Sequence, residues 1–393
     1  MIVLKRTLFK NATVITEGKQ IPDRSVICEG GIISGLYGND MRIESAAEIV
    51  DLKGAYLTPG FIDMHIHGLL GNRTDLNSEE LDRVSSDLPR FGVTGFQPAV
   101  APCEDDLTKL KDLAKAGFPG AKNLGFFLEG HYLALTGALP YIQRDYSVEK
   151  VNSLIDSASP YRIVFGISPE ISNAEELIPA MATQGTPVFI THTGASVEQT
   201  QTAIDLGARH ATHFYDVFPY PGEIEHGVRG CGSVEIILAD SRTTADFILD
   251  GEHVQPAAVK LALRCMGELG VSLITDANVS AGLPPGRYTG LSGVEIVVHY
   301  QGGPARMTEG GPMPGGLVGS GLTMDAAVRN AVTLLGVSLA QAVRMATENP
   351  ARTLGMDNRI GKIAPGMDAD LVVLDRNLQV ISTYISGKRI YHT

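Results

Sequence analysis

Two histidines placed one residue apart, His65 and His67, end the mostly apolar run 61–64 and are followed by Gly68. On a β-strand, side chains at i and i+2 face the same way, so both imidazoles would point to one side and could share a metal ion. Gly68 then allows the chain to turn away without crowding them. The same pattern also fits a strand end with two polar residues, so further ligands are needed to decide.

Four more residues that can bind metal or move protons lie at or next to the ends of other strands expected from the sequence. They are Glu129, His192, His213 and Asp276. Neutral imidazoles with carboxylates suit zinc, iron or a similar divalent ion. We therefore expect one or two divalent ions per chain. Glu129 is a candidate bridge, with His65 and His67 on one ion and His192 and His213 on the other.

The remaining candidates differ in role. A bound metal would lower the pKa of water toward ~7, and Asp276 would take the nucleophile's proton and return it to a leaving amine. His131 lies on a loop over the expected site, and His253 follows a predicted strand at 244–249, so both are candidate substrate contacts. His210 falls on the opposite face of its predicted strand, which favours a structural role.

These residues need a scaffold that gathers strand ends, and the middle of the chain predicts one. Strands are expected at 60–67, 92–100, 123–129, 163–170, 187–192, 210–214, 244–249 and 271–276, with amphipathic helices between most of them. Eight alternating strands predict a (β/α)8 TIM-type barrel, whose functional residues gather at the C-terminal strand ends. No G-x-G-x-x-G follows a strand, which disfavours an open doubly wound sheet. The Gly- and Pro-rich stretch 282–320 is expected to be a long loop.

Both ends of the chain have a different sequence pattern from the middle. Short β-like runs separated by glycines and an Asn-Asp step occur before residue 55 and again after residue 361. Because chain termini often lie close together, we expect a small β-sandwich domain made of residues 1–55 and 355–393. Residues 56–354 would then form the barrel.

Composition narrows the class of protein. The chain has 393 residues, 44% of them hydrophobic and 19% charged, with a net charge of -12. This acidity argues against nonspecific nucleic-acid binding. No stretch approaches the ~18 apolar residues of a membrane span, the first residues lack the apolar core of a signal peptide, and the four cysteines are scattered like reduced thiols. We expect a cytoplasmic enzyme with a small-molecule substrate and neither nucleic-acid nor membrane partners.

The ordered motifs resemble those of the N-acetylglucosamine-6-phosphate deacetylases of the amidohydrolase superfamily. The matching stretches are PGFIDMHIHG (59–68), LGFFLEG (124–130), THTGA (191–195), ATHFYD (211–216), DGEHV (250–254), LITDA (273–277), GLVGSGLTMDAAVRN (316–330), ENPARTLGM (348–356) and GKIAPGMDADLVVLD (361–375). The resemblance implies a metal-dependent enzyme that hydrolyses the acetamide of an N-acetylated amino sugar to a free amine and acetate. It also implies a barrel with a β-sandwich, and a homodimer.

The resemblance also implies roles for individual residues. Glu129, His192 and His213 match metal ligands, and Asp276 matches the catalytic acid and base. Some members lack the H-x-H pair and use one metal, whereas this chain keeps both histidines, which is compatible with two. The candidate substrate-binding residues are Arg73, His131, Asp216, Val217, Arg229, His253, Leu317, Val318 and Gly319.

The substrate side departs from the family pattern. A family histidine that touches the sugar corresponds to Leu139, the asparagine of F-N-A-M corresponds to Asp216, and the arginine that binds phosphate corresponds to Ile224, with Arg229 displaced. Phosphate is typically held by arginine. We therefore expect N-acetylglucosamine 6-phosphate to be a poor substrate, unless Arg229, Arg73 or a neighbouring subunit supplies the cation.

Two other functions remain open. One is hydrolysis of a different amide, such as a cyclic amide or an N-acyl amino acid; members of that group commonly bridge their metals with a carboxylated lysine, which the glutamate at position 129 disfavours. The other is a non-catalytic relative. That alternative predicts missing ligands or a missing Asp276, and none is missing.

Overall fold

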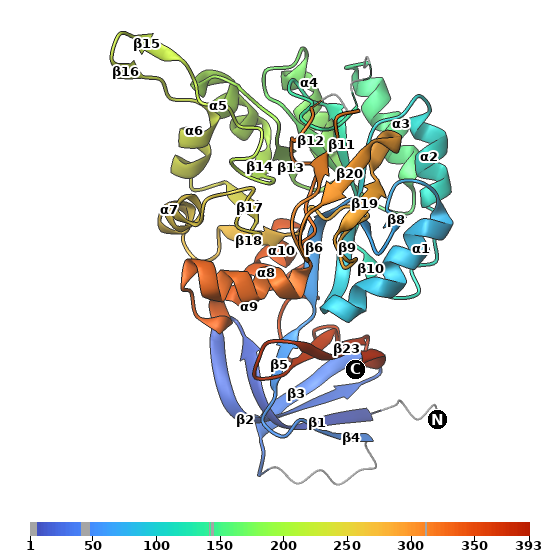
Figure 1. Ribbon diagram of the computed structural model, residues 1–393. Helices are drawn as coiled ribbons and strands as arrows, with labels where there is room; N and C mark the ends of the chain where they lie inside the picture. Colours follow the sequence, from blue (N-terminus) through green and yellow to red (C-terminus); the bar gives the residue numbers. More distant parts are fainter. Residues whose placement is uncertain (1–5, 41–47, 141, 143–144, 311–312) are drawn as a thin grey trace.

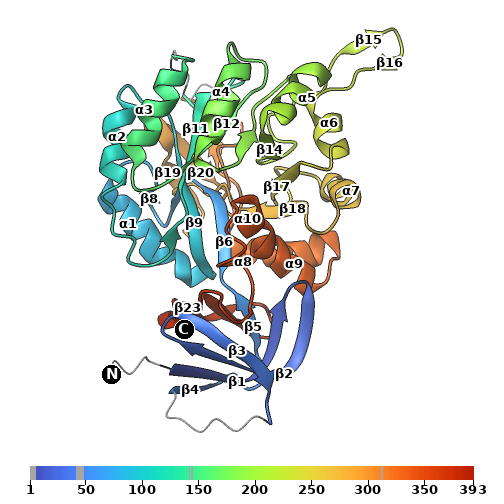
Figure 2. The ribbon, with the colours of Figure 1, turned by 180° about the vertical axis from the view of Figure 1, so that it is seen from behind.

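The computed structural model describes residues 6–40, 48–140, 142, 145–310 and 313–393. A barrel of strands and helices forms the larger part, and a sheet built from both chain ends forms the smaller part (Figure 1). Figure 2 shows the same two parts from behind. Residues 1–5, where no signal-peptide core was recognised, lie outside the described residues. No helix of the described part is long and apolar enough to cross a bilayer.

Eight parallel strands form the barrel, which confirms the predicted (β/α)8 architecture. They are β6 (Phe61–Ile66), β9 (Val93–Val100), β11 (Phe126–Tyr132), β12 (Ile163–Ile167), β13 (Val188–Ile190), β14 (Ala208–Ala211), β17 (Thr244–Ile248) and β18 (Val271–Ile274). Each pairs with the next in this order. A single bridge between Ile66 and Ala277 joins the end of β6 to the chain after β18, so the barrel is nearly closed.

Helices cover the outside of the barrel (Figures 1 and 2). In chain order they are α1 (Ser78–Asp87), α2 (Asp106–Leu113), α3 (Val148–Ala158), α4 (Ala174–Met181), α5 (Val197–Leu206), α6 (Ser233–Ala239), α7 (Pro256–Met266), α8 (Met324–Asn330), α9 (Leu339–Ala346) and α10 (Glu348–Thr353). Five of them, α1, α2, α3, α5 and α9, begin with an N-cap side chain that accepts from a backbone N–H of the first turn. The Ser196 hydroxyl accepts from the Gln199 N–H, and the Gln199 side chain in turn accepts from the Ser196 N–H.

The two chain ends form one eight-stranded sheet. Its strands are β1 (Arg6–Thr16), β2 (Lys19–Glu29), β3 (Ile32–Gly38), β4 (Glu48–Asp51), β5 (Tyr56–Pro59), β22 (Leu371–Leu374), β23 (Val380–Ile385) and β24 (Lys388–His392). The order is β24-β23-β22-β5-β1-β2-β3, with β4 beside β1. The sheet therefore extends past residue 55 to include β5. Its core joins Phe9 and Val26 from one end to Leu371 and Tyr384 from the other.

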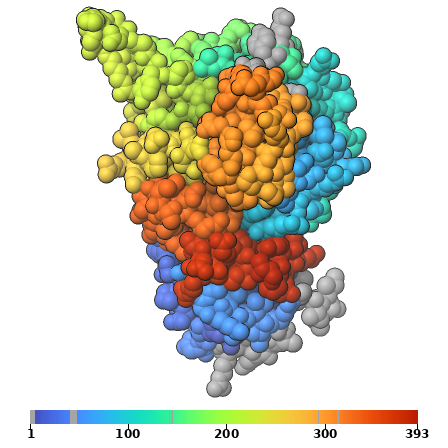
Figure 3. All heavy atoms as spheres, in the orientation of Figure 1, coloured from blue at the N-terminus to red at the C-terminus, as the bar shows by residue number. Residues whose placement is uncertain are grey.

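The stretch 282–320 differs from the expected long loop. It contains an antiparallel sheet of β19 (Gly286–Thr289), β20 (Glu295–Val298) and β21 (Arg306–Met307), which we call the β19–β21 sheet. The alternating residues Ile296 and Val298 of β20 enter a small apolar cluster of their own. Frequent Gly and Pro hid these short strands in the sequence. Figure 3 shows this part, in orange, as a raised block on the front of the barrel.

Candidate metal-binding and catalytic site

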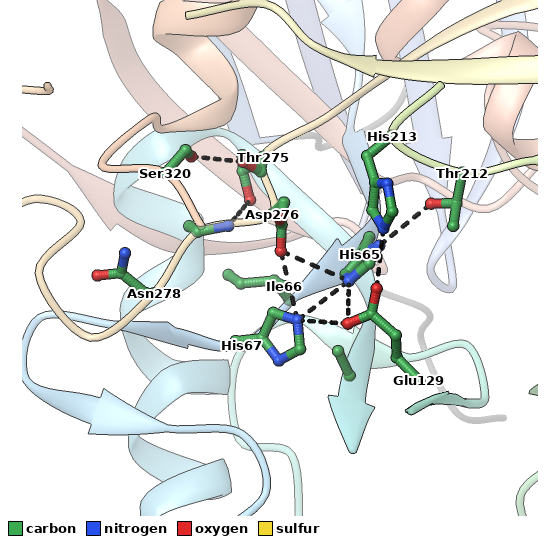
Figure 4. A network of polar contacts seen from close by, with 12 residues as sticks. His65, Ile66, His67, Glu129, Thr212, His213, Thr275, Asp276, Asn278 and Ser320 are labelled. Atoms are coloured by element: carbon green, nitrogen blue, oxygen red, sulfur yellow. Dashed lines mark hydrogen bonds and ion pairs between the residues drawn. The ribbon is translucent and has the colours of Figure 1, made fainter. Parts of the chain in front are cut away.

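Six side chains meet where the barrel strands end. His65 is the last residue but one of β6 and His67 directly follows the strand, Glu129 lies in β11, and each of the other three lies two residues past the end of a strand. Those three are His192, His213 and Asp276. All six are buried, with at most 8% of the residue exposed. The predicted strand-end residues are thus brought together in space. Figure 4 shows five of them, all except His192.

The Glu129 carboxylate lies at the centre of the group. Its Oε2 atom is 2.9 Å from His67 Nε2 and 3.3 Å from His65 Nε2. Its Oε1 atom is 2.8 Å from His213 Nε2 and 3.3 Å from His192 Nε2. Each oxygen therefore faces one pair of imidazoles, as in the predicted bridging role of Glu129.

Asp276 contacts the His65 and His67 side of the group. Its Oδ1 atom is 3.3 Å from His67 Nε2 and 3.5 Å from His65 Nε2, and those two nitrogens are 3.1 Å apart. Two overlapping sets of ligand atoms lie within 4.8 Å of one another: His65 with Glu129 and His213, and His65 with His67 and Asp276. Imidazole nitrogens and carboxylate oxygens at this spacing fit a divalent transition metal.

Three of the six residues have an unusual backbone. His192, His213 and Asp276 have φ of 50°, 34° and 45°. Non-glycine residues rarely adopt this left-handed region, and each such residue costs on the order of 1–3 kcal/mol. Conformations of this kind persist where surrounding contacts fix them, and they cluster at functional sites. Here each lies two residues past the end of a barrel strand.

Charge in the group favours a cation. Burial raises the pKa of the Glu129 carboxyl, but the imidazoles, His65 foremost, outweigh burial and hold that pKa well below its usual range. Burial lowers the pKa of His213, but the hydrogen bond to Glu129 outweighs it and raises that pKa to about 10. Without metal, the Glu129 carboxylate thus favours protonated imidazoles around it. A bound metal ion would supply the same positive charge.

A cavity opens over the six residues. Its walls include most of the predicted substrate contacts, namely Asp216, Val217, His253, Leu317, Val318 and Gly319. His253 is held by Asp250, with 2.6 Å between Nδ1 and Oδ2. Burial lowers the pKa of His253, and Asp250 outweighs this and raises it.

Several other wall residues were not predicted from the sequence. Asn278, Leu291, Ile296 and Met313 also line the cavity, three of them from or beside the β19–β21 sheet. No spacing in the sequence pointed to them, because their position depends on how this sheet folds over the barrel.

Comparison with known proteins agrees with this geometry. Residues 56–390 match the Amidohydrolase family. This chain belongs to the amidohydrolase family. It is 35% identical to the N-acetylgalactosamine-6-phosphate deacetylase of Escherichia coli O157:H7, over 95% of this chain and 97% of that protein. It is 31% identical to the N-acetylglucosamine-6-phosphate deacetylase of Vibrio furnissii, over 96% of this chain and 93% of that protein.

The fold is also similar to a solved structure. The crystal structure of the N-acetylglucosamine-6-phosphate deacetylase from Pasteurella multocida superposes with a TM-score of 0.87 at 26% identity, covering 99% of this chain and 100% of that one.

Three predicted substrate contacts lie outside the cavity of this amidohydrolase. Arg73 donates to Asp75 at 2.7 Å. His131 lies in β11, not on a loop, and is buried beside Asp106 of α2, with 3.2 Å between Nε2 and Oδ1. The strand is irregular here, with a register shift between Leu128 and Tyr132 and a φ of 99° at Gly130, so His131 does not face the same way as Glu129. Arg229 lies in the hairpin of β15 (Glu223–Glu225) and β16 (Val228–Arg229), is 67% exposed, and pairs with Glu235 at 2.6 Å. A single chain therefore does not bring these three to the six site residues.

Proposed function

We propose that this amidohydrolase hydrolyses the acetamide of an N-acetylated amino sugar to a free amine and acetate. The observation that carries the proposal is the convergence of four imidazole Nε2 atoms and the Asp276 carboxylate around Glu129, beneath a cavity. The activities named for its relatives support this substrate class.

In this proposal the histidines and Glu129 hold one or two divalent ions, zinc or iron. Such an ion, when bound, polarises the amide carbonyl and activates water near neutral pH. Asp276 accepts a proton from the attacking water and delivers it to the leaving nitrogen. Its Oδ1 atom lies beside His65 and His67, at the boundary between the metal ligands and the cavity, which suits both transfers.

Elemental analysis of the purified protein tests the cofactor. We expect up to two ions per chain, loss of activity on chelation, and recovery when zinc or iron is restored. A protein without bound transition metal that zinc, iron and manganese all fail to activate would contradict the proposal.

The substrate proposal also concerns phosphate. The described residues that line the cavity include no lysine or arginine, and they do include Asp216. A phosphomonoester carries nearly two negative charges near neutral pH, so a carboxylate facing it is unfavourable. We therefore propose that N-acetylglucosamine 6-phosphate is a poor substrate, although relatives are named for phosphorylated sugars.

A panel of substrates, followed by release of free amine, tests this point. It compares N-acetylglucosamine 6-phosphate with the unphosphorylated sugar and with both N-acetylgalactosamine forms. If the glucosamine 6-phosphate ester is clearly the best substrate, at ~10⁴ M⁻¹s⁻¹ or above, this part of the proposal is wrong. Because Leu139, Leu291, Ile296 and Met313 make part of the wall apolar, N-acyl amino acids and cyclic amides belong in the same panel as the second candidate class.

We further propose a cytoplasmic homodimer. The four cysteines are free, as in reduced thiols. The hairpin of β15 and β16 projects from the barrel (Figure 1). Ile224 and Val228 on it and Tyr220 before it are exposed apolar side chains, and apolar side chains grouped on one projecting segment suit contact with a partner. Light scattering of the eluting protein should give twice the chain mass, and a monomer at micromolar concentration would contradict this.

A further inference from the structure

A chain of buried polar side chains leads away from the metal ligands into the barrel. His65 Nδ1 is 3.1 Å from Thr212 Oγ1 (Figure 4). Thr212 Oγ1 donates to Asp246 Oδ1 at 3.1 Å, and Asp246 Oδ2 is 2.8 Å from His210 Nε2. All four residues have a relative exposure of 0%. We call the last three the His210–Asp246–Thr212 chain.

The order of these groups fixes where the protons lie. A carboxylate only accepts hydrogen bonds, so the single hydroxyl proton of Thr212 goes to Asp246. The Thr212 oxygen can then only accept from the His65 ring, so Nδ1 of His65 carries the proton. His65 Nε2 is left with its lone pair, and it is Nε2 that faces Glu129 and Asp276.

The same carboxylate holds a second candidate ligand. Asp246 Oδ1 accepts from the backbone N–H of His213 at 2.6 Å. His213 has the positive φ of 34°, a conformation that needs outside contacts to persist. Asp246 is therefore connected to one histidine from each pair around Glu129: to the ring of His65 through Thr212, and to the backbone of His213 directly.

Packing alone does not account for the His210–Asp246–Thr212 chain. The His210 ring is fully buried, and its centroid lies 4.4 Å from that of the Phe189 ring, so a polar ring stands against an apolar one. Burying a carboxylate costs free energy unless several donors compensate it, and here His210, Thr212 and His213 are those donors. Sequence reasoning placed His210 on the face away from the site. The structure instead connects it to the site, because His210 of β14 and Thr212, just past the end of that strand, both bond to the Asp246 carboxylate.

We propose that the His210–Asp246–Thr212 chain positions His65 and fixes its ring in the tautomer that binds metal, with the proton on Nδ1 and the lone pair on Nε2. This inference rests on the proposed metal-dependent function. Groups that orient metal-bound histidines in this way typically contribute 10–100-fold to metal affinity. The three residues are positioning residues, because none of them contacts the cavity.

The test removes one hydroxyl. Thr212→Val keeps the shape of the side chain but offers no acceptor to His65, whereas Thr212→Ser keeps the acceptor. Thr186→Val is the matched control, because the buried Thr186 hydroxyl donates to the Ile163 carbonyl at the far end of β13. The zinc dissociation constant of each protein is measured by competition with a chromogenic chelator, and metal-free melting temperatures report stability.

We expect Thr212→Val to weaken zinc binding about 10–100-fold, with Thr212→Ser close to the wild type. Thr186→Val should bind zinc normally even if it melts earlier. Wild-type affinity in Thr212→Val, or equal weakening in Thr186→Val, would overturn the proposal. If Thr212→Val does not fold, Thr212→Ala against Thr212→Ser makes the same comparison. A wild-type protein that binds no metal would instead refute the proposed function, and with it the proposed role of the His210–Asp246–Thr212 chain.

Discussion

Two carboxylates sit a few ångströms from the same histidines and have different surroundings. Glu129 has both oxygens engaged by imidazole nitrogens, two on each side. Asp276 meets two of them through Oδ1 only, at the longer distances of 3.3 and 3.5 Å, and it also lines the cavity. The first environment suits holding a cation, and the second suits passing a proton to a substrate, so the roles we assign follow from the contacts.

Replacing Asp276 separates these roles. Asp276→Asn keeps the size of the side chain but removes the group that accepts and returns a proton, so we expect turnover to fall about a hundredfold or more. Metal content should stay largely intact, because the four histidines and Glu129 remain. Steady-state kinetics and elemental analysis of the same sample measure both. Near-normal turnover would mean that Asp276 is only a strand-end residue.

Asp216 allows a test of the proposed discrimination against phosphate. Asp216→Asn removes one negative charge from the cavity wall, so a phosphorylated substrate should gain relative to its unphosphorylated form. We expect the ratio of their kcat/KM values to shift about tenfold, which is ~1.4 kcal/mol. Asp205→Asn removes the same charge on the outer helix α5 and is the control. An unchanged ratio in Asp216→Asn would show that this carboxylate does not face the substrate's phosphate position.

At the scale of elements, the sequence was sufficient where periodicity and residue type agreed. The alternation of apolar strands with helices predicted the barrel, and histidines or carboxylates at strand ends predicted the six residues that now meet. It failed where position depends on tertiary folding. The β19–β21 sheet was hidden by Gly and Pro, and Asp246 was not predicted as a site residue, because its partners lie on or just after another strand.

The segment after β11 shows how closely a loop fits the site. Gly137 has φ of 57°, and a Cβ there would lie 2.9 Å from His192 Cε1, whereas Gly185 has φ of 70° with nothing within 4 Å. Both Gly→Ala changes carry a left-handed strain of roughly 1–2 kcal/mol. Gly185→Ala should therefore lower only the melting temperature. Gly137→Ala should also lower zinc affinity and turnover, because it displaces a ligand. Equal activity in the two variants would contradict this.

At the scale of the whole molecule, the two parts depend on each other. β22 lies between β5 and β23 in the shared sheet, so C-terminal strands pair directly with an N-terminal one. Lys122, from the short strand β10 (Lys122–Asn123) beside the barrel, is 2.7 Å from Asp370 Oδ2, and Thr383 of β23 donates to the Pro89 carbonyl at 2.7 Å. The candidate metal ligand His65 lies on β6, which begins two residues after β5 ends. Unfolding of the sheet would therefore disturb β6 and His65 directly, because only Gly60 separates β5 from β6.

This dependence can be tested by truncation. A chain ending at Met356 loses β22, β23 and β24, which leaves β5 with an open edge and uncovers apolar residues such as Phe9 and Val26 that pack against the lost strands. Open edges and exposed apolar faces promote aggregation, so we expect little soluble protein and no cooperative melting transition. A chain ending at Gly387 loses only β24, the edge strand, whose residues are mostly exposed. It should fold, bind zinc and retain turnover. Soluble yield, thermal melting and activity of the two truncations give the answer, and a well-folded, active protein ending at Met356 would show that the barrel does not need the sheet.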